Sequence, residues 1–148
     1  MKKSLYSAFL ILCIGGTLWS QNVYYKYQVK DAAQLNSLYN ATGGASWINK
    51  QNWPVNDAVT FSYNVPYGIQ FVRGDTLVIH YPSPQKDTGI IQLRVKEIHL
   101  NENHLSGALP ALQLDSLKVA EFALNSISGM GNLQTPKLQR LLISANPL

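Results

Sequence analysis

The fold of this chain is decided by three similar stretches in its last third. They read VKEIHLNENHLSG (residues 95–107), LKVAEFALNSISG (117–129) and LQRLLISANPL (138–148). In each stretch an apolar residue stands at positions one, four, six and eleven, and an asparagine stands at position nine. The equivalent asparagines, Asn103, Asn125 and Asn146, are 22 and 21 residues apart. Such a pattern, at a period of about 20–29 residues, predicts a stack of repeats with one short strand in each.

The repeats also predict which side chains form the core. Side chains alternate between the two faces of a strand, so positions four and six of each repeat should point inward. These positions hold Ile98, Leu100, Ala120, Phe122, Leu141 and Ile143. One repeat cannot cover its own apolar side chains, so neighbouring repeats must cover them. Because a large buried side chain contributes about 1.5–3 kcal/mol, we expect Ala120 to form a weaker layer.

Polar and glycine positions predict how the chain leaves each strand. Asn103, Asn125 and Asn146 stand where the strand turns into a loop. We expect their side chains to bond backbone groups that the bend leaves unpaired, forming a ladder from repeat to repeat. Gly107 and Gly129 follow and are predicted to permit a sharp loop geometry.

The remaining strand positions predict an outward face and a candidate binding surface. They form three columns: Glu97, Val119 and Arg140; His99, Glu121 and Leu142; and Asn101, Ala123 and Ser144. The surface mixes both signs of charge with a small apolar strip from Val119, Ala123 and Leu142. We expect His99 and Glu121 to be cross-strand neighbours about 5 Å apart.

Residues 21–92 are predicted to cap the repeats. Residues 21–30 lead into a helix for which Asp31 is a suitable N-cap. Leu35, Leu38 and Tyr39 share one face of this helix, and glycines at 43–44 end it.

The apolar period changes to two from Ile69 onward. Alternating apolar residues on both sides of residues 73–75, an Arg-Gly-Asp triplet, predict a hairpin that turns at this triplet. Prolines and polar residues at 82–87 predict an exposed loop before the first repeat, which begins at about residue 93.

At this point the chain resembles the leucine-rich repeat proteins. LNSLYNATGG (35–44), together with Trp47 and Trp53, resembles the N-terminal cap shared by exported bacterial members and plant receptors. NHLSGALP (103–110) resembles the plant-type NxLSGxLP repeat. The resemblance covers residues 31–148, although the paired cysteines of the plant cap are missing. It implies an α/β solenoid with a short parallel strand in each repeat, a helix-plus-hairpin cap and a concave face that binds proteins or peptides.

The first twenty residues resemble a secretory signal peptide. Lys2 and Lys3 precede an apolar core at 8–14, and we expect cleavage after Ser20. Removing both lysines lowers the net charge from +4 to +2, which is ten basic minus eight acidic residues. No later stretch reaches the roughly 20 apolar residues of a membrane span. The mature chain is therefore expected to be secreted or at the cell surface. Its only cysteine, Cys13, lies in the predicted signal peptide and would be removed by cleavage, so we expect no disulfide in the mature chain.

No motif for catalysis or for a cofactor is present. There is no HExxH, phosphate-binding loop, GxGxxG or GxSxG. His99, Glu102, His104 and Glu121 could suggest a metal or acid–base site, but the repeat pattern explains them as a polar face and a turn. The basic residues are not interleaved with aromatics, so nucleic acid is not an expected partner. We predict no enzyme activity, cofactor or metal.

The sequence therefore predicts a protein that recognises a protein or peptide outside the cytoplasm. About two and a half repeats occupy residues 93–148, and the last one is incomplete. Either the chain is a piece of a longer protein, with a separate effector domain, or its uncapped end pairs with another copy. A second hypothesis is a carbohydrate-binding or adhesion module at the cell envelope. Its aromatic residues would be Trp47, Trp53, Tyr24, Tyr25 and Tyr27.

Overall fold

The computed structural model describes residues 24–56, 64–82 and 87–148. The predicted signal peptide at 1–20 lies outside these ranges. The elements, in chain order, are β1 (Tyr24–Val29), α1 (Ala32–Ala41), the 3₁₀ turn η1 (Gly44–Ser46), β2 (Ile69–Ile79), β3 (Thr88–His99), β4 (Ser106–Leu109), β5 (Leu112–Gln113), β6 (Val119–Glu121), β7 (Ser126–Met130), β8 (Leu133–Gln134) and β9 (Arg140–Leu142). The protein is thus a mixed α/β fold in which most strand pairs are parallel.

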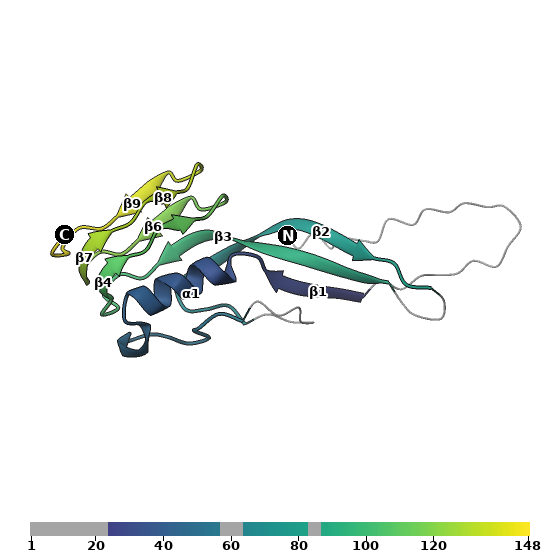
Figure 1. The fold of residues 1–148 in the computed structure, drawn as a ribbon, viewed down its shortest axis with the longest axis horizontal. Coiled ribbons are helices and arrows are strands. Elements are labelled where there is room, and N and C mark those ends of the chain that lie inside the picture. Colours follow the sequence, from purple (N-terminus) through teal and green to yellow (C-terminus); the bar gives the residue numbers. More distant parts are fainter. Residues whose placement is uncertain (1–23, 57–63, 83–86) are drawn as a thin grey trace, which may run out of the picture.

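Strand β3 connects the two ends of the molecule. Its first part lies between β1, which is parallel to it, and β2, which is antiparallel to it. Its last three residues pair in parallel with β6, and β6 pairs in parallel with β9. In Figure 1 the strands β1, β2 and β3 extend to one side as an arm, and the shorter strands gather at the other end.

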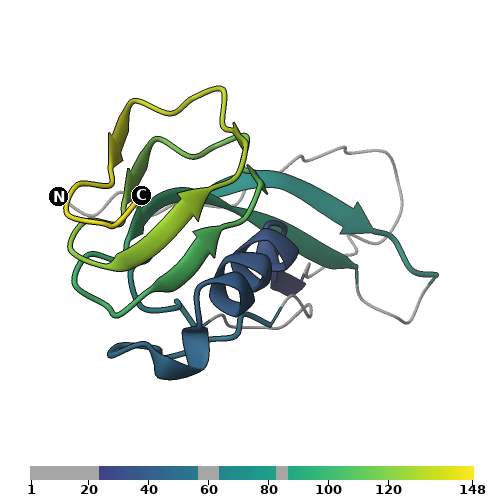
Figure 2. The ribbon, with the colours of Figure 1, turned by 60° about the vertical axis from the view of Figure 1, so that its left-hand side comes forward.

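Three layers of chain are stacked at that end, and we call them the first (95–116), second (117–137) and third (138–148) layers. Three parallel pairings join the first layer to the second: β3–β6, β4–β7 and β5–β8. The parallel pairing β6–β9 joins the second layer to the third. Figure 2 shows the layers lying one upon the next. Helix α1 contacts β4 and β5 of the first layer, and the Ser106 N–H donates to the Thr42 carbonyl at 3.0 Å. The cap therefore covers one side of the stack.

Four of the six predicted inward positions are confirmed. Ile98, Leu100, Ala120 and Phe122 are almost completely buried. They belong to one apolar core that runs from Val29 in β1 to Ile127 in β7. In the third layer Leu141 remains 38% exposed and Leu148 59% exposed, because no described layer lies beyond it. Within the described residues no helix is both long and apolar enough to cross a membrane.

A β-bulge at Lys96 joins the arm to the layers. Gln70 pairs with Glu97 and Phe71 pairs with Val95, so Lys96 has no partner residue on β2. Burial on β3 follows odd positions up to Val95 and then shifts to Ile98. One extra residue reverses which side chains face the core. The bulge therefore lets a single strand serve both the arm and the first layer.

Several predictions for the cap are wrong. Residues 24–29 are not a leader but the strand β1, because parallel pairing with β3 satisfies their backbone groups. Asp31 is the N-cap residue of α1, as predicted, and its carbonyl accepts the Leu35 N–H at 3.1 Å, but its side chain makes no capping hydrogen bond. Its carboxylate instead accepts the Val95 N–H at 2.8 Å and pairs with Arg94 at 3.1 Å. The helix does end where predicted, with Gly43 in the left-handed region at φ 67°.

The predicted hairpin is placed wrongly. Residues 69–79 form one strand, β2, and its partner is β3. Gly74 and Asp75 form a bulge opposite β3 rather than a turn, since pairing resumes at Thr76. The loop predicted at 82–87 includes 83–86, which lie outside the described residues. Asp87, predicted to be exposed, is buried and accepts the Tyr81 N–H at 3.0 Å.

The two repeat glycines behave differently. Gly107 has φ 84°, which favours glycine, and a Cβ there would lie 2.9 Å from the Ala41 carbonyl oxygen. Gly129 has no such conformation, and its nearest neighbour would be the Ala108 Cβ at an ordinary 3.5 Å. The special role predicted for Gly129 is therefore wrong.

Candidate functional site

The strand register assembles the predicted outward residues into one surface, which we call the strand face. Glu97 lies beside Val119, which lies beside Arg140; His99 lies beside Glu121, which lies beside Leu142. The third column follows, since the Asn101 side-chain oxygen accepts the Ala123 N–H at 2.7 Å. The strand face consists of Glu97, His99, Asn101, Val119, Glu121, Ala123, Arg140, Leu142 and Ser144.

His99 lies at the centre of the charged part of this face. Its Nδ1 is 2.9 Å from a Glu121 carboxylate oxygen, and its Nε2 is 3.0 Å from a Glu97 carboxylate oxygen. Both ring nitrogens donate to carboxylates only when the imidazole is protonated. The arrangement therefore favours a histidinium held between two carboxylates.

Glu121 is the most enclosed charge of the strand face. Its carboxylate pairs with His99, accepts a hydrogen bond from the Asn101 side-chain amide at 3.2 Å and forms an ion pair with Arg140 at 3.2 Å. The residue is only 9% exposed. A carboxylate at this depth needs such partners, because burying an unpaired charge is costly.

The pKa values follow from these contacts. The hydrogen bond to Glu121 raises the pKa of His99, and the hydrogen bond to Glu97 adds to this effect. The pKa of Glu121 is lowered mainly by the hydrogen bond from His99 and then by the charge of Arg140. The pKa of Glu97 is lowered mainly by Lys96 and then by His99. Each group thus favours the charged form of its neighbour.

The edges of the strand face differ in what they offer a ligand. Lys96, brought to this side by the bulge, pairs with Glu97 at 2.7 Å. Arg140 has a side chain 62% exposed, so most of its guanidinium remains available beyond its contact with Glu121. Val119 and Leu142 are half-buried, whereas Ala123 is buried and adds little to the predicted apolar strip. The accessible part therefore centres on Arg140, Leu142 and Ser144.

The charged side chains of the strand face contact one another, and both ring nitrogens of His99 are engaged by carboxylates. In the described part of the chain, no group of three or more His, Cys, Asp and Glu residues is placed to hold a metal. Glu102 and His104, predicted to lie in a turn and point to solvent, are exposed and have left-handed φ values of 50° and 60°.

The asparagines form hydrogen bonds between successive layers. The Asn125 side-chain oxygen accepts the N–H groups of Asn103 and Leu105 at 2.9 and 3.0 Å. Its amide donates to the carbonyls of Leu100, Phe122 and Ala123. Asn146 similarly joins the third layer to Phe122 and Ile127. Asn103 joins the first layer to Asn49 of the cap at 2.7 and 3.1 Å. The side chains of these asparagines therefore form hydrogen bonds within the fold.

The aromatic residues of the carbohydrate hypothesis are placed unfavourably for it. Trp47 and Trp53 are 3% and 8% exposed and pack edge to face, with Tyr39 stacked on Trp53. Their indole nitrogens donate to the carbonyls of Thr42 and Tyr67. Neither indole is available to stack on a sugar ring. Tyr27 packs partly against the core and Tyr25 is exposed, while the side chain of Tyr24 lies outside the described residues.

Sequence reasoning missed the lysines that border the strand face. Lys96, Lys118 and Lys137 lie in or just before the strands of successive layers. The repeat pattern contained the signal for Lys118, because it occupies the position equivalent to Lys96 one period later. No comparable pattern in the sequence predicts the β-bulge at Lys96, next to Glu97.

Comparisons with known proteins returned no similarity on which to base a function. No protein-family model matches the chain, and no match was found among curated proteins or solved structures.

Proposed function

We propose that residues 93–148 are leucine-rich repeats and that their strand face recognises a protein or peptide ligand. The single observation that carries this proposal is the in-register alignment of β3, β6 and β9. Parallel strands at this period expose one residue column after another on a common surface, which suits an extended ligand.

The loops after the strands support the repeat assignment. The residue before each ladder asparagine has a left-handed backbone, with φ 50° at Glu102, 56° at Leu124 and 57° at Ala145. A non-glycine residue rarely adopts this conformation. Its recurrence at one position of every layer, together with the shared asparagine bonds, supports a common repeat unit.

The proposal includes a location outside the cytoplasm and assigns no reaction. The location rests on the sequence of residues 1–20, with its two lysines and apolar core. No reaction is proposed because both ring nitrogens of His99 are hydrogen-bonded to carboxylates.

Peptide display tests the strand face. Peptides selected on the purified protein from a random library would be measured by fluorescence anisotropy against Arg140→Ser and Leu142→Ser. Matched controls are Arg73→Ser on β2 and Met130→Ser on β7, which remove exposed side chains of the same kinds elsewhere. We expect roughly tenfold weaker binding for the strand-face variants, since central anchor side chains dominate interface energies. Selected peptides that respond to the controls, or to none of the four changes, would refute the proposal.

A further inference from the structure

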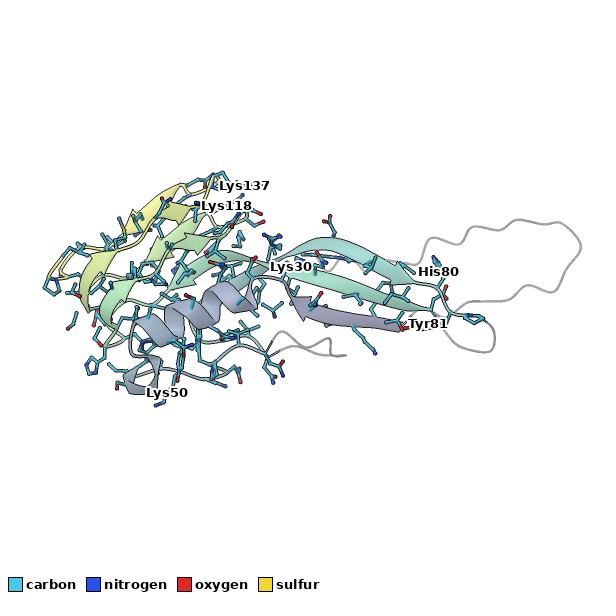
Figure 3. All side chains as sticks on the ribbon, in the orientation of Figure 1. Lys30, Lys50, His80, Tyr81, Lys118 and Lys137 are labelled. Carbon is cyan, nitrogen blue, oxygen red and sulfur yellow. The ribbon has the colours of Figure 1, made fainter. Side chains whose placement is uncertain are left out.

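One border of the strand face carries a surplus of positive charge. Six basic residues lie near the starts of β6 and β9 or beside the adjoining part of β3, and we call them the basic edge: Lys30, Arg94, Lys96, Lys118, Lys137 and Arg140. Backbone hydrogen bonds connect this edge from layer to layer. Lys30 N–H donates to the Leu93 carbonyl, Lys118 N–H to the Lys96 carbonyl and Arg140 N–H to the Lys118 carbonyl. Figure 3 labels Lys118 and Lys137 at the upper border of the layers and Lys30 where the arm begins.

The acidic residues near this edge are already paired. Asp31 and Asp115 both contact Arg94, at 3.1 Å each. Glu97 contacts Lys96 and His99, and Glu121 contacts His99 and Arg140. Six basic residues minus these four acidic ones leave a local charge of +2 before His99 is counted.

The surplus resides in lysines that are free to meet a ligand. Lys30, Lys118 and Lys137 are exposed, and none of them forms an ion pair with any residue in the described ranges. Lys118 follows Lys96 across adjacent strands, where side chains of like charge repel each other. An anionic partner at this edge would relieve the repulsion.

From this placement we infer that the ligand is an acidic peptide segment, whose carboxylates contact Lys118 and Lys137 while its chain crosses the strand face near Arg140 and Leu142. The inference rests on the proposed function and names the chemistry of its ligand. A single-stranded nucleic acid fits less well, because base stacking needs exposed aromatic rings beside the cations. Among the side chains that the structure describes, the exposed tyrosines Tyr25, Tyr67 and Tyr81 lie instead on the arm or in the segments that flank β2.

The probe for this inference is a fluorescent short peptide of alternating glutamate and glycine, with its glutamine counterpart as the uncharged reference. Binding to the whole protein would be followed by anisotropy at low and at physiological salt. The edge variant is Lys118→Gln with Lys137→Gln. The matched control is Lys50→Gln with Arg73→Gln, which removes the same charge from exposed positions on other elements.

We expect the glutamate peptide to bind more tightly than the glutamine peptide and to weaken with salt. The edge variant should weaken its binding roughly three- to tenfold, as expected for two exposed charge contacts, and the control should change it little. Equal loss in both double variants would mean that net charge alone acts, and would overturn the inference. Equal binding of the two peptides would also overturn it.

Oligothymidylate supplies the remaining outcome. If oligothymidylate binds more tightly than the glutamate peptide, and if the edge variant weakens that binding, the basic edge would be assigned to nucleic acid and the inference would be overturned.

The proposed function and the further inference can fail separately. Display-selected peptides that need Leu142 but neither carboxylates nor Lys118 would retain the strand face as a binding site and remove the acidic ligand. If the glutamate peptide needs Lys118 and Lys137 but its binding does not change in the Leu142 and Arg140 variants, the strand face would be ruled out as the binding site instead.

Discussion

Asn125 illustrates how one residue type can hold two layers of chain together. Its side chain bonds five backbone groups, two as acceptor and three as donor. No other side chain of similar size offers both a carbonyl and an amide in this geometry; aspartate, for example, only accepts when it is ionised. The same position is occupied by Asn103 and Asn146 because each loop presents the same unpaired backbone groups.

Replacing Asn125 by alanine should therefore destabilise the fold strongly. We expect the free energy of unfolding to fall by about 2–3 kcal/mol, because partly buried backbone donors and acceptors lose their partners. Urea denaturation of Asn125→Ala measures this loss. Asn132→Ala, an exposed asparagine near β8, serves as the control and should change stability by less than about 0.5 kcal/mol. Equal stability of the two variants would contradict the ladder.

His99 should make stability depend on pH in a defined direction. Its pKa is raised in the folded protein, mainly by Glu121, so its contribution is complete below the unfolded value of about 6.5. This contribution is lost as the pH rises through the higher folded pKa. Glu97 and Glu121 have lowered pKa values, so their contributions are present above about 4.5 and are lost as the pH falls through the lowered values. The charged part of the strand face is therefore most stabilising between these limits.

The test is thermal unfolding of the protein and of His99→Gln at pH values from mildly acidic to mildly alkaline. We expect the melting temperature of the unmodified protein to fall more steeply above neutral pH than that of the variant. Parallel curves for the two proteins would show that His99 does not carry the dependence. A histidine resonance titrating above the ordinary range, and absent in His99→Gln, would identify the group directly.

At the scale of the elements, equivalent strand positions differ in how well they are covered. Ile98, Ala120 and Leu141 are aligned on β3, β6 and β9, but Ile98 is fully buried and Leu141 is not. The small Ala120 between them limits the apolar contact that the middle layer can make. The layers therefore become less tightly packed from the cap toward β9.

This gradient predicts different costs for the same truncation. Ile98→Ala should lower the free energy of unfolding by about 2–4 kcal/mol, because it leaves a cavity beside the core of the cap. Leu141→Ala should cost less than about 1 kcal/mol, since its side chain keeps part of its contact with water in the folded state. Chemical denaturation of both variants measures the difference. Similar costs would mean that Leu141 is covered as well as Ile98.

The predicted hairpin in the arm is wrong because β2 has a more distant strand as its partner. Alternating residues on both sides of Arg73-Gly74-Asp75 fit a hairpin by local rules. The long strand β3 provides a partner for the whole of β2, and a bulge at Gly74 and Asp75 absorbs the residue that interrupts the alternation. Pairing with a distant strand thus overrode a local turn preference.

In the molecule as a whole, β3 pairs with β1 and β2 in the arm and with β6 in the layers, so one strand belongs to both parts. The core is continuous from Val29 through Val95 to Ile127, and no linker divides it. We therefore expect the Lys30 amide, which donates to Leu93 beside the arm, and the Leu100 amide, which donates to Glu121 in the second layer, to exchange only upon global unfolding.

Native-state hydrogen exchange checks this expectation. The exchange free energies of the Lys30 and Leu100 amides should agree within about 0.5 kcal/mol and converge with the global unfolding energy. The Leu124 amide, which donates to Ser144 in the third layer, should exchange at a lower cost because Leu141 of that layer is 38% exposed. Independent unfolding of the arm would appear as a much lower value for Lys30.

Local properties of the sequence predicted the features that repeat along the chain. The period of 22 and 21 residues, the inward residues such as Phe122, and the columns from Glu97 to Arg140 all follow from alternation and spacing, which are local properties of a strand. The end of α1 at Gly43 also followed from a local rule, because glycine alone adopts that conformation without strain.

The tertiary fold produced the features that depend on contact between distant residues. It turned residues 24–29 into β1 and directed the Asp31 carboxylate to Val95 instead of to its own helix. It also enclosed His99 between two carboxylates from different strands. In each case the partner lies far away in the sequence or depends on the bulge at Lys96, so no local pattern could specify it.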